Sequence, residues 1–350
     1  MAADDNEAMN RTDPPSAAPT DVDTSALQGQ LPLADWGVIA ARGPEARKFL
    51  HGQLTQDVET LAAGQARLAG YCSPKGRLLA TFVLWADGPE DILLACSADL
   101  AAATLKRLSM FVMRSKCKLS DVGGECVLHG LAGDAAARWL GAAAPGAVWG
   151  ITPRGAGQVI RLPDAAGVQR YLLAQVKAHG AAHAATASDA ADAMKAVEPE
   201  APDLPAMQPA AWRWLEVQSG VVRIVAATSE KFVPQMVNLE LVGGVNFQKG
   251  CFPGQEIVAR SQYRGTLKRR LFNFESDTAA SAGDEVFSAD DAEQPAGMVA
   301  LVAPLPGNAG RSSLLVEAKI ASTSAPLHLR SADGPLLSLR TLPYPIPTEA

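Results

Sequence analysis

Residues 243–260, which read GGVNFQKGCFPGQEIVAR, form the most informative stretch of this 350-residue chain. Pro253 suits the first turn of a helix, and the residues after it continue a helical pattern. Cys251 would then lie just ahead of a helix N-terminus, where free backbone N–H groups favour an anion. Lys249, two residues away, also favours the thiolate, which is the reactive form of cysteine. The stretch therefore predicts a reactive thiol at Cys251.

Two glycines flank this thiol. Gly250 and Gly254 allow a close approach of two backbones or a positive φ, because glycine has no Cβ. The alternative is that Cys251 is a small buried residue of the core, as many free cysteines are. The glycines, the lysine and the turn residues around Cys251 favour the reactive role.

The other cysteines point to a reducing compartment. The five cysteines lie at positions 72, 96, 117, 126 and 251. They form no CxxC pair, and their odd number without a secretory signal argues against a disulfide framework, so we expect a cytoplasmic protein. Cys117 and Cys126 with His129 would still lack a fourth zinc ligand, so no metal site is expected. Cys96 lies in an apolar run and is expected in the core.

The net charge of −6 is concentrated at the N-terminus. The first 30 residues carry −5, which leaves a nearly neutral body with no broad basic surface for nucleic acid. Residues 1–30 are predicted to be a disordered acidic tail, and no apolar run is long enough to span a membrane. One stretch, 249–270, holds six basic residues against Glu256 alone. It could meet an anionic ligand or be a solvated strand and loop.

Apolar periodicity predicts an α+β unit near the start of the chain, with helices on one face of a sheet. Its expected strands are 36–42, 66–72, 78–85 and 92–96, and its expected helices are 45–53 and 99–111. Residues 119–176 repeat short strands around an Ala-rich helix near 134–140. Residues 179–208 are of low complexity and predict a loose helix or a surface connection. Residues 268–345 alternate in short segments between turns, which is typical of a small β-barrel or sandwich.

Several separated motifs resemble those of the YgfZ-type folate-binding proteins, within the superfamily of the glycine-cleavage T-protein, an aminomethyltransferase. The motifs are FLHGQLTQDV (49–58), YCSPKGR (71–77), FVPQMVN (232–238), KGCFPGQE (249–256) and the closing LPY (342–344). The resemblance implies an aminomethyltransferase-like α+β fold with subdomains around a central hole and a C-terminal small β-barrel. It divides the chain into a tail (1–30), a folate-binding domain (31–118 with 207–267), a second α+β domain (119–206) and the barrel (268–350).

The resemblance also implies a ligand, tetrahydrofolate or a derivative. Trp36 and Trp212 match positions that border the folate in the family, and an indole face against a flat pterin ring is a sensible contact. Both tryptophans could instead be core aromatics, and Trp214 competes with Trp212 for the role.

The function that the resemblance implies is assembly or repair of iron–sulfur proteins, with an indirect effect on tRNA thiomethylation. Cys251 would be the working group and Lys249 its activator, within a motif that includes Gly250, Gly254 and Gln255. Glu256 and Arg260 would fix the conformation of the loop. Expected partners are folate and iron–sulfur proteins or their assembly machinery. Neither a membrane nor direct contact with nucleic acid is expected, and we expect a monomer.

One departure separates the chain from the T-protein. That enzyme carries an acidic pair after a glycine turn, whereas this chain has Leu79 and Ala80 where the acids would fall. Because neither residue can accept a proton, the aminomethyltransferase chemistry is expected to be lost while the folate site remains. A one-carbon transferase with Cys251 as nucleophile stays an alternative, but it needs a base, and only the fold could bring His51 close. A direct tRNA-binding role is weakest, since no RNA-binding module accompanies the basic stretch.

Overall fold

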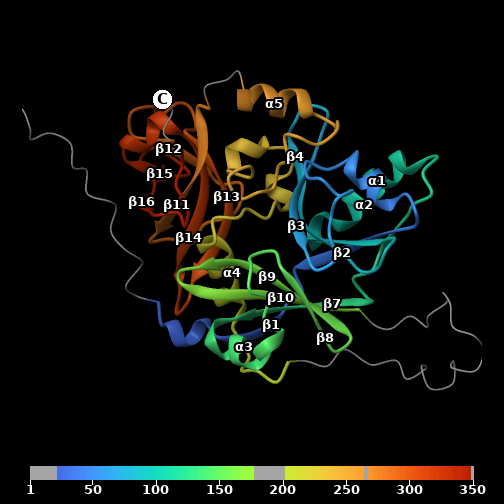
Figure 1. The fold of residues 1–350 in the computed structure, drawn as a ribbon. Helices are drawn as coiled ribbons and strands as arrows, with labels where there is room; N and C mark the ends of the chain where they lie inside the picture. The colour runs from blue at the N-terminus through green and yellow to red at the C-terminus, as the bar shows by residue number, and fades with distance from the viewer. Residues whose placement is uncertain (1–21, 177–201, 264–266, 348–350) are drawn as a thin grey trace, which may run out of the picture.

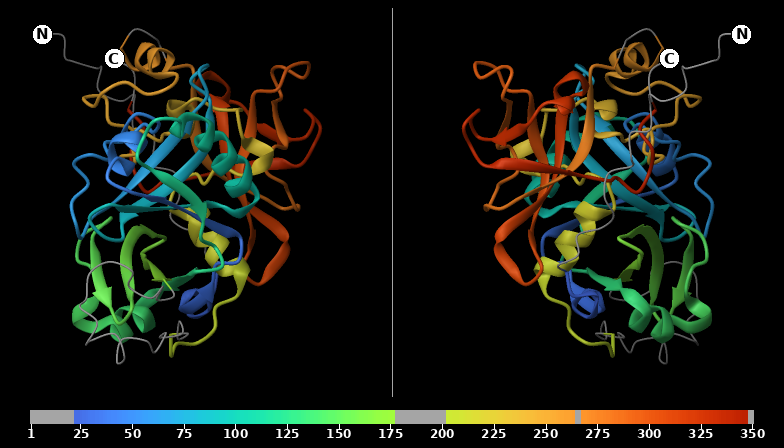
Figure 2. Two further views of the ribbon diagram at one scale, coloured as in Figure 1. Left: turned by 90° about the vertical axis from the view of Figure 1, so that its right-hand side faces the viewer. Right: turned by 90° about the vertical axis from the view of Figure 1, so that its left-hand side faces the viewer.

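The computed structural model describes residues 22–176, 202–263 and 267–347 (Figure 1). Two five-stranded antiparallel sheets and one closed six-stranded barrel make up this part of the chain. Figure 1 and the two views of Figure 2 show the second sheet beneath the first sheet and the barrel. Helix α4 (Pro209–Gln218) lies where the three meet. None of the helices in these ranges is both long enough and apolar enough to cross a bilayer.

The first sheet has the strand order β3-β4-β5-β2-β6. Its strands are β2 (Trp36–Arg42), β3 (Ala66–Cys72), β4 (Leu78–Ala86), β5 (Asp91–Ser97) and β6 (Lys118–Asp121). The central strands are apolar at nearly every position because both of their faces are buried. Helix α2 (Ala98–Val112) packs on β2 and β5, and α1 (Ala46–His51) follows β2. The strands and helices predicted between residues 36 and 111 are therefore confirmed, with their ends shifted by at most two residues.

The second sheet has the strand order β1-β7-β10-β9-β8, and α3 (Gly133–Leu140) packs against it. Its strands are β1 (Gly29–Pro32), β7 (Cys126–Ala132), β8 (Ile151–Arg154), β9 (Gly157–Ala165) and β10 (Val168–Val176). The Ala-rich helix predicted near 134–140 is thus present. Of the low-complexity run 179–208, the part up to residue 201 lies outside the described residues.

Two predicted boundaries need correction. The tail was predicted to extend to residue 30, but Thr24–Leu27 forms a 3₁₀ turn and β1 pairs with β7, because Leu27 and Leu33 are buried there. Residues 1–21 lie outside the described residues. Strand β6 pairs with β2 in the first sheet, so residues 119–121 do not belong to the second domain.

The barrel confirms the prediction for the C-terminal part. Its strands are β11 (Arg269–Ser276), β12 (Glu285–Ser288), β13 (Gly297–Leu305), β14 (Asn308–Lys319), β15 (Leu327–Leu329) and β16 (Leu336–Arg340). The barrel closes because β11 pairs with both β14 and β16. It has an apolar core of its own, whereas both sheets and α4 contribute to one large core.

Candidate functional site

A cavity lies where the two sheets meet α4. Strands β2, β3, β4 and β5 line it from the first sheet, and β9 and β10 line it from the second. The lining of the cavity therefore comes from both sheets and from α4.

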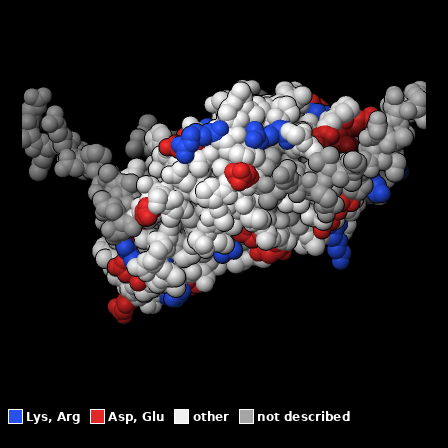
Figure 3. All heavy atoms as spheres, turned by 90° about the horizontal axis from the view of Figure 1, so that it is seen from below, with Lys and Arg blue, Asp and Glu red and all other residues white. Residues whose placement is uncertain are grey.

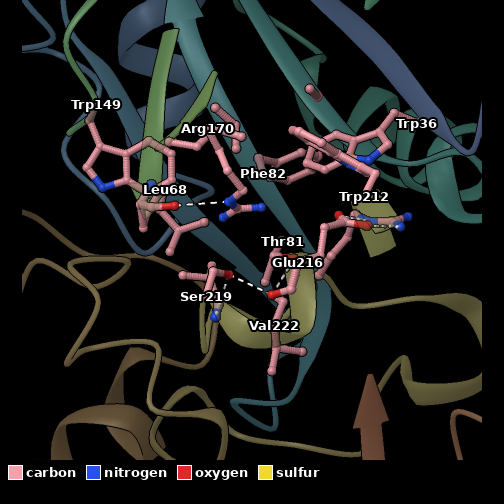
Figure 4. Close-up of a pocket in the computed structure, with 16 residues that line it drawn as sticks. Trp36, Leu68, Thr81, Phe82, Trp149, Arg170, Trp212, Glu216, Ser219 and Val222 are labelled. Carbon is pink, nitrogen blue, oxygen red and sulfur yellow. Dashed lines mark hydrogen bonds and ion pairs between the residues drawn. The ribbon is translucent and has the colours of Figure 1, made fainter. Parts of the chain in front are cut away.

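Three tryptophans line this cavity: Trp36 at the start of β2, Trp149 ahead of β8, and Trp212 in α4 (Figure 4). Trp36 is half-buried and Trp212 is buried. Trp214 is also buried but does not line the cavity, so of the two candidates in α4 only Trp212 faces it. The indole of Trp212 lies flat against Gly130, where an added Cβ would come within 2.7 Å of the ring. Glycine at this position of β7 therefore lets the ring reach the cavity wall.

A buried ion-pair network forms another wall. Arg223 donates to Glu216 Oε1 (3.1 Å) and to Asp35 Oδ2 (3.0 Å), and its guanidinium lies 5.0 Å from the centre of a Trp36 ring. Burial alone would lower the pKa of Arg223, but the two carboxylates outweigh it and raise that pKa. Glu216 is the single carboxylate among the described cavity-lining residues. Because it is paired with Arg223, the cavity holds no free carboxylate in this part of the chain.

Leu79 and Ala80 lie on β4 directly before Thr81, which does line the cavity. Leu79 instead borders a separate groove beside α2, and Ala80 is buried. The strand thus presents a hydroxyl and apolar side chains to the cavity rather than acids.

Cys251 lies in a different region, which we call the thiol loop (residues 243–254). Its side chain is exposed, so the alternative of a buried core cysteine is wrong. Cys96 is buried, as predicted, and so are Cys72 and Cys126. Burial raises the pKa of these three thiols to about 12, and that of Cys117 to about 11.

The start of the following helix needs correction. Helix α5 (Gln255–Tyr263) begins two residues after Pro253, because Gly254 has a φ of +78° and cannot belong to a right-handed helix. Cys251 is therefore four residues ahead of the first helical residue rather than directly at the helix end. An added Cβ on Gly254 would come within 2.4 Å of the Ser73 carbonyl oxygen, so the predicted close backbone approach at this glycine is confirmed. A Cβ added to Gly250 would lie 3.4 Å from His51 Nε2, which is an ordinary contact, so crowding does not require glycine at this position.

Lys249 is an anchor of the thiol loop. Its ammonium donates to the backbone carbonyls of His51 and, at 2.8 Å, of Leu54. Burial lowers the pKa of Lys249 to about 8, while the charges of Asp57 and Cys251 act in the opposite direction. The charge of Cys251 therefore favours the protonated form of Lys249, although the N–H groups of the lysine donate to backbone carbonyls.

Glu256 and Arg260 do not fix the loop. Both side chains are exposed, and neither makes a hydrogen bond or ion pair within the described ranges. The loop is held instead from the segment after α1, where the Thr55 hydroxyl donates to the Gly244 carbonyl (2.6 Å) and Gln56 Nε2 donates to the Gly243 carbonyl (2.7 Å). These partners are short and buried, so they can satisfy backbone groups that two solvated charges on α5 cannot reach.

No family model matches the chain, but individual proteins do. It is 34% identical over 249 residues to the tRNA-modifying protein YgfZ of Edwardsiella ictaluri, with 69% of each chain covered. The chain belongs to the YgfZ family. It is 29% identical to the YgfZ protein of Sodalis glossinidius over 336 residues, which cover 90% of this chain and 93% of that one. The fold is similar to that of a glycine cleavage system aminomethyltransferase from Bartonella henselae, with a TM-score of 0.61, 19% identity and coverage of 91% and 87%.

The family resemblance and the aminomethyltransferase-like fold are thus confirmed, and the structure shows how two residues of the motif 49–58 lie beside the thiol loop. In this YgfZ-family chain His51 Nδ1 lies 3.0 Å from Asp57 Oδ1. Burial raises the pKa of Asp57, but hydrogen bonds from Thr60 and His51 outweigh it, and the net shift is downward. The other ring nitrogen of His51 faces Gly250, at 3.4 Å from an added Cβ. The histidine and aspartate both lie in the motif 49–58, but only the fold places them beside the thiol loop.

The site residues of this YgfZ-family protein fall into two groups. Trp36 and Trp212 line the cavity, whereas none of residues 249–260 does. Three further cavity residues, Trp149, Glu216 and Arg170, were missed because no local motif marks them. The sequence offered one signal for Arg170, which is a charged residue within the apolar strand β10, where the structure buries it.

Within the described part of the basic stretch 249–270, three of the cations are engaged inside the protein. Arg270 pairs with Glu240, and Arg269 donates two hydrogen bonds to Glu317 (2.9 and 3.0 Å). With Lys249 also bonded internally, half of the six cations are engaged within the protein. Figure 3 shows the opposite face of the molecule, seen from below and away from α5, and there too lysines and arginines are interspersed with acids.

Proposed function

We propose that this protein binds tetrahydrofolate or a derivative in the central cavity and serves the assembly or repair of iron–sulfur proteins. The observation that carries the proposal is the cavity between Trp36, Trp149 and Trp212, which suits a flat ring. The indole N–H groups of Trp36 and Trp212 are buried and make no hydrogen bond within the described chain. Because buried donors are normally paired, a ligand with acceptor groups fits this lining.

Cys251 is proposed as the reactive group. Its exposure supports this role, since the other four cysteines are wholly or partly buried and their pKa values are raised. An exposed thiol can meet a second protein directly, as work on an iron–sulfur partner requires. Lys249, Gly250 and Gly254 would hold the thiol loop in place for that contact.

The effect on tRNA is proposed to be indirect. The relatives' name calls them tRNA-modifying proteins. An iron–sulfur enzyme of tRNA thiomethylation would depend on this protein for its cluster. The internal pairing of Lys249, Arg269 and Arg270 supports this version over direct tRNA binding, which depends on free cations.

Binding and cellular rescue together test the proposal. Titration of the purified protein with tetrahydrofolate should quench its tryptophan fluorescence, and expression in cells lacking the protein should restore iron–sulfur enzyme activity and tRNA thiomethylation. p-Aminobenzoylglutamate lacks the pterin ring and serves as the control for quenching by the rest of the ligand. Saturable quenching without rescue would contradict the proposed role in iron–sulfur protein maintenance. The absence of quenching would contradict the proposed binding of folate.

A second candidate is a one-carbon transferase with Cys251 as nucleophile. The His51–Asp57 pair favours it, because an aspartate that accepts from Nδ1 leaves Nε2 free to accept a proton. A glycine-cleavage assay with the other components supplied distinguishes the two. We expect no aminomethyl transfer above background, since the described cavity lining has no free carboxylate. Turnover that His51→Gln abolishes would establish the second candidate in place of the first.

A further inference from the structure

Arg170 of β10 is a buried cation that the family motifs leave unexplained. Its side chain is 3% exposed, and Figure 4 shows its guanidinium pointing into the cavity between Trp149 and Trp212. Nε donates to the Pro163 carbonyl at 3.0 Å. That is its one hydrogen bond within the described ranges, so its two terminal nitrogens have no partner there. An arginine is rarely buried without an anion or carbonyl to receive its donors.

The surroundings of Arg170 offer it little compensation. The guanidinium lies 5.5 Å from the centre of a Trp212 ring, so a cation–π contact supports it on one side. The nearest carboxylate of the lining, Glu216, already accepts two hydrogen bonds from Arg223. Burial lowers the pKa of Arg170 to about 10, although the charges of Glu216 and Asp164 act in the opposite direction. The site is therefore an arrangement of donors that lacks an acceptor.

We propose that Arg170 binds the oxygen-bearing edge of a flat heterocyclic ring and so selects the ligand of the cavity. For a reduced folate, on whose binding this inference rests, that edge is the 4-oxo group of the pterin. The guanidinium fork would donate to the oxygen while the ring lies among the indoles. A carbonyl oxygen has two lone pairs and can accept one hydrogen bond from each terminal nitrogen of Arg170.

The depth of Arg170 favours the ring over the glutamate tail. A second cavity adjoins the first, and Glu216 and Arg223 line both. Arg213 lines it with a side chain that is 50% exposed, but Arg213 is paired with Asp35 at 3.6 Å, and Asp99 lines this cavity as well. Because Arg170 is 3% exposed, the ring is assigned to the cavity that Arg170 lines, and the charged tail is expected to extend toward solvent.

The inference can be tested by exchanging one group on the protein and one on the ligand. Tetrahydroaminopterin carries an amino group in place of the 4-oxo group, which turns the acceptor into a donor that faces Arg170. We expect it to bind wild-type protein roughly 10- to 100-fold more weakly than tetrahydrofolate, as for the loss of a buried charged hydrogen bond. Arg170→Met should weaken tetrahydrofolate by a similar factor and bind both ligands nearly equally. Arg170→Lys keeps the charge without the fork and should lie between the two proteins.

Arg154→Met is the matched control, because Arg154 also lies over an indole, that of Trp139, but does not line the cavity. It should bind both ligands like wild type. A wild-type protein that binds the two ligands equally would overturn the inference without any variant. So would an Arg170→Met effect seen equally with p-aminobenzoylglutamate, since the arginine would then meet the tail. If wild type binds no tetrahydrofolate, the proposed function fails and this inference fails with it.

Discussion

The central cavity and the thiol loop differ in almost every physical respect. The cavity is buried and rich in donors, and its tryptophans come from three separate segments of the chain. The thiol loop presents an exposed cysteine, and short buried hydrogen bonds hold its backbone. The first arrangement suits the binding of a small molecule, and the second suits contact with another protein. If the proposed ligand binding and the proposed thiol chemistry are separable in this way, a substitution in one region should leave the other region unaffected.

The most severe test of this separation is Cys251→Ser. A hydroxyl is close in size to a thiol but is not a nucleophile at neutral pH, so we expect complete loss of rescue in cells lacking the protein. Affinity for tetrahydrofolate should stay unchanged, because Cys251 does not line the cavity. Cys117→Ser, which replaces another cysteine that is not fully buried, should rescue fully and provides the control. Full rescue by Cys251→Ser would make the loop a structural element only.

The next prediction concerns the selectivity of labelling. At pH 8 a thiol with a pKa of about 12 is ionised to roughly one part in 10⁴, so Cys72, Cys96 and Cys126 should react with iodoacetamide about a thousandfold more slowly than a free thiol. Mass spectrometry should find the label on Cys251. In urea all five cysteines should be labelled. Saturating tetrahydrofolate should not protect Cys251, and strong protection would show that the two regions communicate.

A smaller effect is expected on the pH dependence of stability. The pKa of Lys249 is about 8 in the folded protein, below its ordinary value of 10.5, so the unfolded chain binds more protons between these pH values. The free energy of unfolding should therefore rise with pH in this window, by about 1–2 kcal/mol between pH 7.5 and 9.5. Lys249→Met should lack this rise when urea unfolding is measured at both pH values. Equal slopes for the two proteins would mean that the folded lysine titrates normally.

The sequence predicted the two regions unequally. The thiol loop is continuous in the chain, so spacing alone located Cys251, Lys249 and the close approach at Gly254. Its supports, Thr55 and Gln56, lie about 190 positions away and became visible only through their hydrogen bonds. The predicted helix start in this loop was wrong, because the positive φ of Gly254 delays the start of α5 to Gln255.

The cavity was predicted less completely because strand pairing assembles it. Trp36 and Trp212 were found through a family resemblance, while Arg170 and Trp149 belong to segments without a motif. The choice between Trp212 and Trp214 depended on which face of α4 meets the cavity, and two residues so close on one helix differ by about 200° in direction. Strand and helix positions, by contrast, followed from apolar periodicity and were close to correct.

The smallest expected effect is that of Trp36→Ala on the cavity. Trp36 is half-buried at the start of β2, and the Arg223 guanidinium lies over one face of its ring. Loss of one stacked aromatic costs about 0.5–1.5 kcal/mol beyond the loss of buried area, so tetrahydrofolate should bind roughly 2- to 12-fold more weakly. Trp214→Phe should bind like wild type, because Trp214 does not line the cavity. The rate of Cys251 alkylation should be the same in all three proteins. Unchanged affinity in Trp36→Ala would remove this tryptophan from the binding site, and a changed alkylation rate would contradict the separation of the two regions.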